Sequence, residues 1–217
     1  MNFVAFDLDG VLINSKQAYI TAFSKAIKML GGKTDVTELA EPLGRPVREV
    51  LENIIPDSEV DVNGYEDLVK ELASRDDVIA SIPVNPKALE TLEAIKALES
   101  FKLVLVTNSD ANFTLKVLKK NSFFDFFDEV LTADKRPIPK DERLRKIIKR
   151  YNSIPYESFF IGDLPADIYA AREVGLKSIA VYNSLSWVYP EKWKIIDAKP
   201  DFLVEDLCEI RSVITQE

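Results

Sequence analysis

Residues 3–15 read FVAFDLDGVLINS, and this stretch indicates an α/β fold. Its first four residues are apolar and form a short run that is typical of a buried β-strand. Asp7 and Asp9 close the run at spacing i and i+2, so on a straight strand both carboxylates share one face. Open α/β sheets bind their ligands at the carboxyl ends of strands. We therefore expect a functional carboxylate pair there, although a lone Asp-x-Asp is equally typical of an ordinary loop.

The composition limits the chemistry that is available to the chain. It has 217 residues, of which 47% are hydrophobic and 29% charged, with a formal net charge of −8. An acidic chain is unsuited to non-specific nucleic-acid binding, which needs a basic face. The sequence contains no histidine and a single cysteine, which excludes imidazole catalysis, His-containing metal sites and internal disulfides. Carboxylate, hydroxyl, amine and guanidinium groups remain, together with any metal that oxygen ligands hold.

No signal peptide is visible at the amino terminus. The amino terminus enters the apolar run with no basic segment before it, and no apolar stretch approaches the length that spans a bilayer. We therefore expect a cytoplasmic protein with no membrane partner.

Strand-like runs alternate with helical patterns along most of the chain. This alternation is typical of βαβ units and predicts a parallel, Rossmann-like sheet with right-handed crossovers. Strands are expected at 3–6, 103–107, 129–131, 159–161 and 178–181, and helices at 111–120, 141–151 and 165–174.

One long interval after the first strand has no strand pattern. Apolar residues keep a helical spacing in three successive segments between about 19 and 72. We therefore predict an all-helical domain at 15–82, inserted into an α/β core that consists of 1–14 and 83–217.

Three further motifs follow strands or precede helices. Thr107-Asn108-Ser109 ends a strand, and hydroxyl and amide donors there are suited to phosphoryl oxygens beside a helix amino terminus. A cationic stretch, residues 135–140, precedes a helix. Asp163 follows a Gly at the end of another strand, and Asp167 lies four residues later. Taken singly, these motifs are typical of turns, solvated loops and helix caps.

Taken together and in this order, the four motifs resemble the haloacid dehalogenase superfamily, in the branch with a helical cap that includes phosphoglycolate phosphatase and β-phosphoglucomutase. The resemblance implies that Asp7 is the nucleophile, Asp9 the general acid/base, and Thr107 with Asn108 the phosphate-binding pair. It also implies a Mg²⁺ site made by Asp7, Asp163 and Asp167 with the backbone carbonyl of Asp9. Arg45, in the Gly-Arg-Pro of the insert, matches the specificity loop of the cap.

Two positions depart from the family pattern. Its third motif is a lysine, and two residues compete for that place: Arg136 is followed by Pro-x-Pro, whereas Lys140 is better placed relative to the apolar stripe of the next helix. We prefer Lys140 and keep Arg136 as the alternative, since either cation would offset charge on a phosphoryl group. Leu164 stands where relatives usually carry Ser or Thr.

The predicted function is Mg²⁺-dependent hydrolysis of a small phosphomonoester, of the phosphoglycolate or sugar-phosphate type, through an aspartyl phosphate. A phosphosugar mutase of the β-phosphoglucomutase type uses the same core residues and remains an alternative. A catalytically silent protein that binds a phosphorylated ligand is less favoured, because both Asp7 and Asp9 are present. The expected partner is a small phosphorylated substrate, and the expected state is a monomer or a homodimer.

Overall fold

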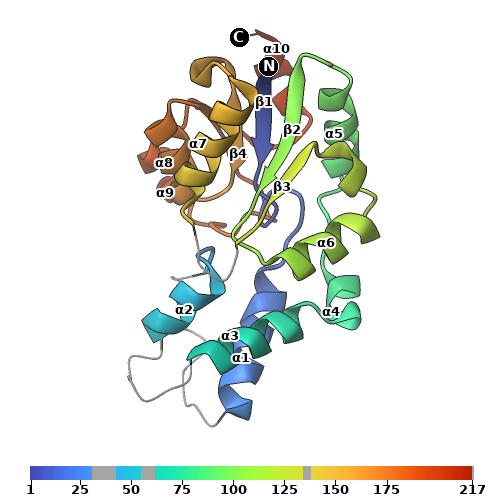
Figure 1. Ribbon diagram of the computed structural model, residues 1–217, viewed down its shortest axis with the longest axis vertical. Helices are drawn as coiled ribbons and strands as arrows, with labels where there is room; N and C mark the ends of the chain where they lie inside the picture. The colour runs from blue at the N-terminus through green and yellow to red at the C-terminus, as the bar shows by residue number, and fades with distance from the viewer. Residues whose placement is uncertain (31–42, 55–61, 134–137, 217) are drawn as a thin grey trace.

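The strands of the computed structural model form a single parallel sheet in the order β3-β2-β1-β4-β5-β6 (Figure 1). The structure describes residues 1–30, 43–54, 62–133 and 138–216. The strands are β1 (Asn2–Phe6), β2 (Phe101–Val106), β3 (Glu129–Leu131), β4 (Phe159–Gly162), β5 (Lys177–Val181) and β6 (Phe202–Val204). The predicted α/β class and its parallel sheet are confirmed.

Helices cover both faces of this sheet. The helices of the core are α5 (Ala88–Lys96), α6 (Ala111–Lys120), α7 (Lys140–Tyr151), α8 (Pro165–Val174), α9 (Lys192–Ala198) and α10 (Glu209–Gln216), with short 3₁₀ turns at Phe124–Phe126 and Pro155–Glu157. Alternate side chains of β1 belong to two different apolar clusters. Val4 and Phe6 pack with α5, α6 and α10, whereas Phe3 and Ala5 pack with α7 and α8. Strands buried on both faces explain why their sequences are continuous apolar runs.

Among the described residues of the long interval after β1, the regular elements are helices. The interval contains α1 (Lys16–Met29), α2 (Val47–Ile54), α3 (Val62–Ala73) and α4 (Asp76–Ser81), which we call the helical insert. These helices pack on one another below the carboxyl ends of the strands in the view of Figure 1. The insert therefore faces the edge of the sheet where the predicted site residues lie.

The boundaries of several elements differ from the predictions. The strand β6 and the helices α4 and α9 had no predicted counterpart, and α7 begins at Lys140 rather than at residue 141. β6 is a three-residue strand at the edge of the sheet. Among the described residues, no helix is long and apolar enough to cross a membrane.

Candidate active site

The register of the sheet brings three of the predicted motifs to one edge. Phe6 of β1 is paired with Leu105 of β2 and with Ile161 of β4, so the residues that follow these strands are neighbours. Gly10 has a φ of +77°, and a Cβ atom there would lie 2.0 Å from Oδ2 of Asp163. Only glycine therefore allows both the turn after β1 and the close approach of the Asp163 carboxylate.

Three buried carboxylates converge at this edge. Asp7, Asp163 and Asp167 each offer an oxygen, and these oxygens lie within 4.8 Å of one another. The buried Nζ of Lys140 lies 2.7 Å from Oδ2 of Asp7 and 2.6 Å from Oδ1 of Asp167. We call Asp7, Asp163 and Asp167 together the acidic group. When these three carboxylates and Lys140 are all ionised, two negative charges remain uncompensated.

The acidic group fits a divalent cation. Oδ1 of Asp163 is buried and has no hydrogen-bond partner among the described residues, while Oδ2 accepts from the backbone N–H of Trp187. Burial raises the pKa of Asp7 to about 7 although Lys140 opposes the shift, and burial with the charges of Asp167 and Asp7 raises the pKa of Asp163. Buried carboxylates that resist ionisation, with an unpaired oxygen among them, are suited to a hard cation such as Mg²⁺.

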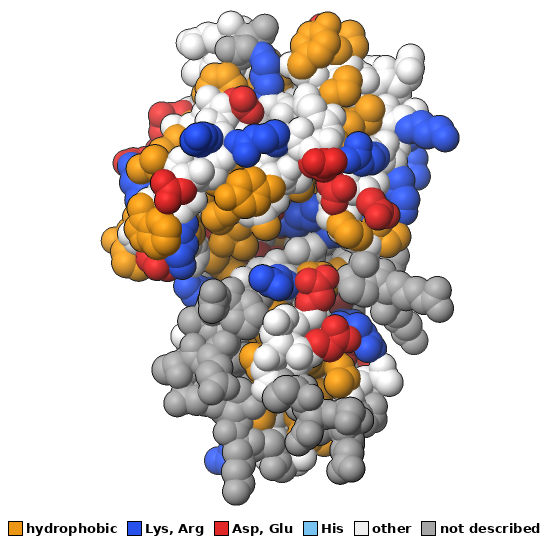
Figure 2. Space-filling view, turned by 90° about the vertical axis from the view of Figure 1, so that its left-hand side faces the viewer, with side chains coloured by type: hydrophobic (Ala, Val, Ile, Leu, Met, Phe, Trp, Pro, Cys, Tyr) orange, Lys and Arg blue, Asp and Glu red, His pale blue; other side chains and the backbone are white. Residues whose placement is uncertain are grey.

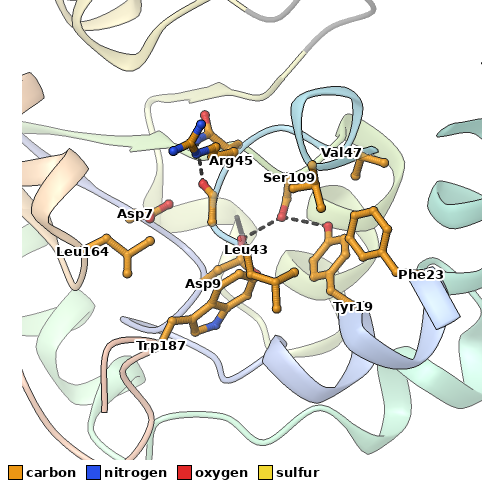
Figure 3. A pocket seen from close by; sticks show the side chains of 13 residues that line it. Asp7, Asp9, Tyr19, Phe23, Leu43, Arg45, Val47, Ser109, Leu164 and Trp187 are labelled. Carbon is orange, nitrogen blue, oxygen red and sulfur yellow. Dashed lines mark hydrogen bonds between the residues drawn. The ribbon is translucent and has the colours of Figure 1, made fainter. Parts of the chain in front are cut away.

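The carboxylate of Asp9 points away from the acidic group and toward hydroxyl groups. Its oxygens accept hydrogen bonds from Ser15, from Ser109 at 2.6 Å and from Thr107 at 3.1 Å. The hydroxyl of Tyr19, on α1, donates in turn to Ser109 at 2.9 Å (Figure 3). Burial raises the pKa of Asp9 and these hydrogen bonds oppose the shift, so the environment favours a carboxyl that can exchange a proton.

The predicted phosphate-binding pair lies beside Asp9, and both side chains have protein partners. The hydroxyl of Thr107 donates to Asp9, and Nδ2 of Asn108 donates to the backbone carbonyl of Gly44 at 2.9 Å. Oδ1 of Asn108 accepts from the guanidinium of Arg143, which also donates to the carbonyl of Thr107. The buried Arg143 therefore holds the loop after β2 from the side of α7.

The two predicted arginines have different outcomes. Arg45 is exposed and lies directly before α2, in the loop whose Gly44 contacts Asn108. Gly44 has a φ of +99°, and a Cβ atom there would lie 2.4 Å from Cδ1 of Leu164, so this loop lies tightly against the core. Arg136, the alternative to Lys140, lies outside the described residues.

Two adjoining spaces lie between the core and the helical insert. A small cavity of about 30 Å³ borders Asp7 and Asp9, and Leu164 and Trp187 form its wall on the core side (Figure 3). A wider cleft of about 910 Å³ lies beside it, bordered by Lys140 and by residues of α8, and separates the core from the insert on the face shown in Figure 2. The cleft is an access route to the acidic group.

Sequence reasoning missed four residues that contact the predicted ones: Ser15, Tyr19, Ser109 and Arg143. Ser15 and Ser109 lie within the two motifs that it had singled out, so their hydroxyls could have been considered as donors to Asp9. Tyr19 falls at the start of the helical spacing near residue 19, which gives no sign of a hydrogen bond to Ser109. Arg143 lies on α7 one turn after Lys140, where only the buried face of the helix reveals its role.

Residues 4–181 match the family model described as haloacid dehalogenase-like hydrolase. The chain is similar to phosphoglycolate phosphatase of Vibrio vulnificus, with 27% identity over 97% of this chain and 95% of the relative. It is also similar to pyrophosphatase PpaX of Bacillus anthracis, with 25% identity over 99% of this chain and 97% of the relative. A predicted phosphatase from Clostridium acetobutylicum has the same fold, with a TM-score of 0.84, 20% identity and coverage of 100% of this chain and 99% of that one.

Proposed function

Because the chain belongs to the haloacid dehalogenase-like hydrolase family and is a phosphatase, we propose that it is Mg²⁺-dependent and hydrolyses a small phosphomonoester, of the phosphoglycolate or sugar-phosphate type, through an aspartyl phosphate on Asp7. The observation that carries the proposal is the cluster of Asp7, Asp163 and Asp167, two of which bond to Lys140. Beside it, the described side-chain hydrogen bonds of Asp9 all come from hydroxyl groups. Two carboxylates in different environments are suited to different chemical roles.

The proposed reaction has two steps. An oxygen of Asp7 attacks phosphorus in line, the bond from phosphorus to the leaving oxygen breaks, and Asp9 gives its proton to that oxygen. Water then attacks the phosphorus of the aspartyl phosphate, its proton passes to Asp9, and the bond to Asp7 breaks to release phosphate. Lys140 offsets charge on Asp7 and on the phosphoryl group, and Thr107 and Asn108 hold phosphoryl oxygens after exchanging their present partners.

Mg²⁺ would be held by Asp7, Asp163 and Asp167, together with the backbone carbonyl of Asp9. When bound, it supplies positive charge that balances the acidic group and the transferred phosphoryl group. Asp163 supports this assignment most directly, because its buried Oδ1 has no hydrogen-bond partner among the described residues.

We assign the helical insert, within residues 15–82, to a cap over the core of 1–14 and 83–217. Asn108 of the core contacts Gly44 of the insert, and Lys16 of α1 donates to the carbonyl of Trp187 at 2.7 Å. Contacts of this kind suit a cap that excludes bulk water while the aspartyl phosphate exists.

The test is phosphate release from a panel that contains phosphoglycolate, sugar phosphates, nucleotides and an aryl phosphate, with and without Mg²⁺. Asp7→Asn is the inactive variant, and Asp201→Asn, which changes an acid that bonds to Ser178 near β6, is its matched control. We expect Mg²⁺-dependent release that Asp7→Asn abolishes and the control retains. Release that is equal in Asp7→Asn would contradict the assignment of the nucleophile. Release of no phosphate, with isomerisation of a sugar phosphate, would instead indicate a mutase.

A further inference from the structure

We propose that the small cavity beside Asp9 receives a short, largely apolar organic leaving group, so that the enzyme discriminates against pyrophosphate and against polyhydroxylated sugar phosphates. This inference rests on the proposed function and narrows its substrate class. It also favours one of the two activities for which the similar proteins are named, since phosphoglycolate has a short organic leaving group and pyrophosphate does not.

The position of the cavity identifies it as the leaving-group site. In-line attack by Asp7 places the departing oxygen on the far side of phosphorus, within reach of the acid that protonates it. The cavity borders both Asp7 and Asp9, and side chains of the helical insert form part of its wall (Figure 3). A leaving group attached to that oxygen can therefore extend into this cavity, whose wall shares Arg45, Leu164 and Trp187 with the wider cleft.

Apolar side chains from both sides form most of its wall. The insert contributes Phe23 of α1, Leu43, and Val47 and Val50 of α2, and the core contributes Leu164 and Trp187. All of these are buried except Leu164, which is half-buried. The volume of about 30 Å³ that is open to the centres of water-sized spheres is roughly two to three times what one water molecule needs, so the site suits a leaving group of a few heavy atoms.

The polar groups in the wall already have partners. Nδ2 of Asn108 donates to the carbonyl of Gly44 and, in the proposed reaction, exchanges it for a phosphoryl oxygen rather than for the leaving group. The hydroxyl of Ser109 donates to Asp9, and the hydroxyl of Tyr19 donates to Ser109. A leaving group with several oxygens would therefore bury them against carbon, and each unpaired polar group costs about 1–3 kcal/mol in a protein interior.

The charges in the wall act in the same direction. Among the described residues that line the cavity, Arg45 is the cation, it is exposed, and Asp7 and Asp9 are acids. A departing phosphate from pyrophosphate carries more than one negative charge and would meet one cation at the rim. A carboxylate at the end of a short carbon chain carries one charge, which Arg45 can meet.

The experiment compares kcat/KM, in the presence of Mg²⁺, for propyl phosphate, phosphoglycolate, glucose 6-phosphate and pyrophosphate. We expect both short monoesters to exceed pyrophosphate and glucose 6-phosphate by about 100-fold, because several oxygens of each disfavoured leaving group lose hydrogen bonds. Val50→Thr, which places a hydroxyl in the wall at nearly constant shape, should reduce the ratio of propyl phosphate to pyrophosphate by about tenfold. Val117→Thr makes the same change at an equally buried position on α6 and should leave that ratio unchanged.

A ratio of substrates is insensitive to loss of folded enzyme, so reduced stability of either variant does not obscure the result. A kcat/KM for pyrophosphate or glucose 6-phosphate that equals or exceeds that of the short monoesters would overturn the inference and leave the phosphatase standing. Equal ratios in Val50→Thr and wild type would also overturn it. Absence of Mg²⁺-dependent release from all four compounds and from an aryl phosphate would refute the proposed function itself.

Discussion

Replacement of Lys140 by methionine should destabilise the protein strongly in the absence of Mg²⁺. The ammonium group lies 2.7 Å from Asp7 and 2.6 Å from Asp167, and the residue is 9% exposed. Methionine keeps the length of the side chain and removes the charge, so two buried carboxylates lose their counter-ion. Removal of one partner from a buried ion pair costs about 3–5 kcal/mol. In a chain of this size, that corresponds to a fall in Tm of roughly 6–20 °C.

The assay is thermal and urea unfolding, followed by circular dichroism in a chelating buffer near pH 8. Lys146→Met is the matched control, because Lys146 lies on the same helix and is exposed. Addition of Mg²⁺ at about 100 times its Kd should restore roughly 2.7 kcal/mol to Lys140→Met. A loss below about 1 kcal/mol for Lys140→Met, or equal losses for the two variants, would refute the reasoning that Lys140 neutralises the acidic group.

Three further predictions concern the turn, the loop and the acids. Gly10→Ala should lower the free energy of unfolding by about 2 kcal/mol or more in urea titrations, because residue 10 has left-handed backbone and its new Cβ atom would clash with Asp163. A loss within roughly 0.5 kcal/mol, the effect of a surface substitution, would contradict this. Arg143→Leu should raise KM about tenfold or more in steady-state assays, because Asn108 loses its charged donor, and an unchanged KM would argue against that role. In a chelator, the free energy of unfolding should fall as pH rises from 3.8 toward about 7, because the raised pKa of Asp7 makes the folded state bind the proton more tightly than the unfolded state. Urea unfolding across this range should show a flatter fall with Mg²⁺ or in Asp7→Asn. A slope that is equal in wild type and Asp7→Asn would contradict the assignment of the raised pKa to Asp7.

The parallel sheet was predictable because its central strands are buried on both faces. A run such as residues 3–6 is apolar throughout, and a polar residue marks its end. The convergence of Asp7, Thr107 and Asp163 followed from the same logic, since parallel strands present their carboxyl ends at one edge. β6 escaped prediction although the equally short β3 did not, so the length of a strand does not by itself decide whether its pattern is recognised.

Contacts between side chains of distant elements were not predictable from local patterns. Lys140 was preferred to Arg136 because of the spacing of apolar residues on the next helix. That spacing indicates which face of the helix is buried, but it does not indicate which carboxylates Lys140 contacts. Tyr19 illustrates the same limit, because its helical spacing indicates burial whether its hydroxyl bonds to Ser109 or to water. Such partners depend on the docking of the insert, which no single segment encodes.

The central claim is that Asp7 carries the phosphoryl group, and the most direct measurement is mass spectrometry of acid-quenched enzyme. Asp9→Asn should be mixed with p-nitrophenyl phosphate and Mg²⁺, because that leaving group departs without an acid whereas hydrolysis of the intermediate needs the base that this variant lacks. We expect one phosphoryl group on the peptide that contains Asp7, and none in Asp7→Asn. A phosphoryl group on another residue, or phosphate release by Asp9→Asn with no phosphoenzyme at any time of quenching, would contradict the account.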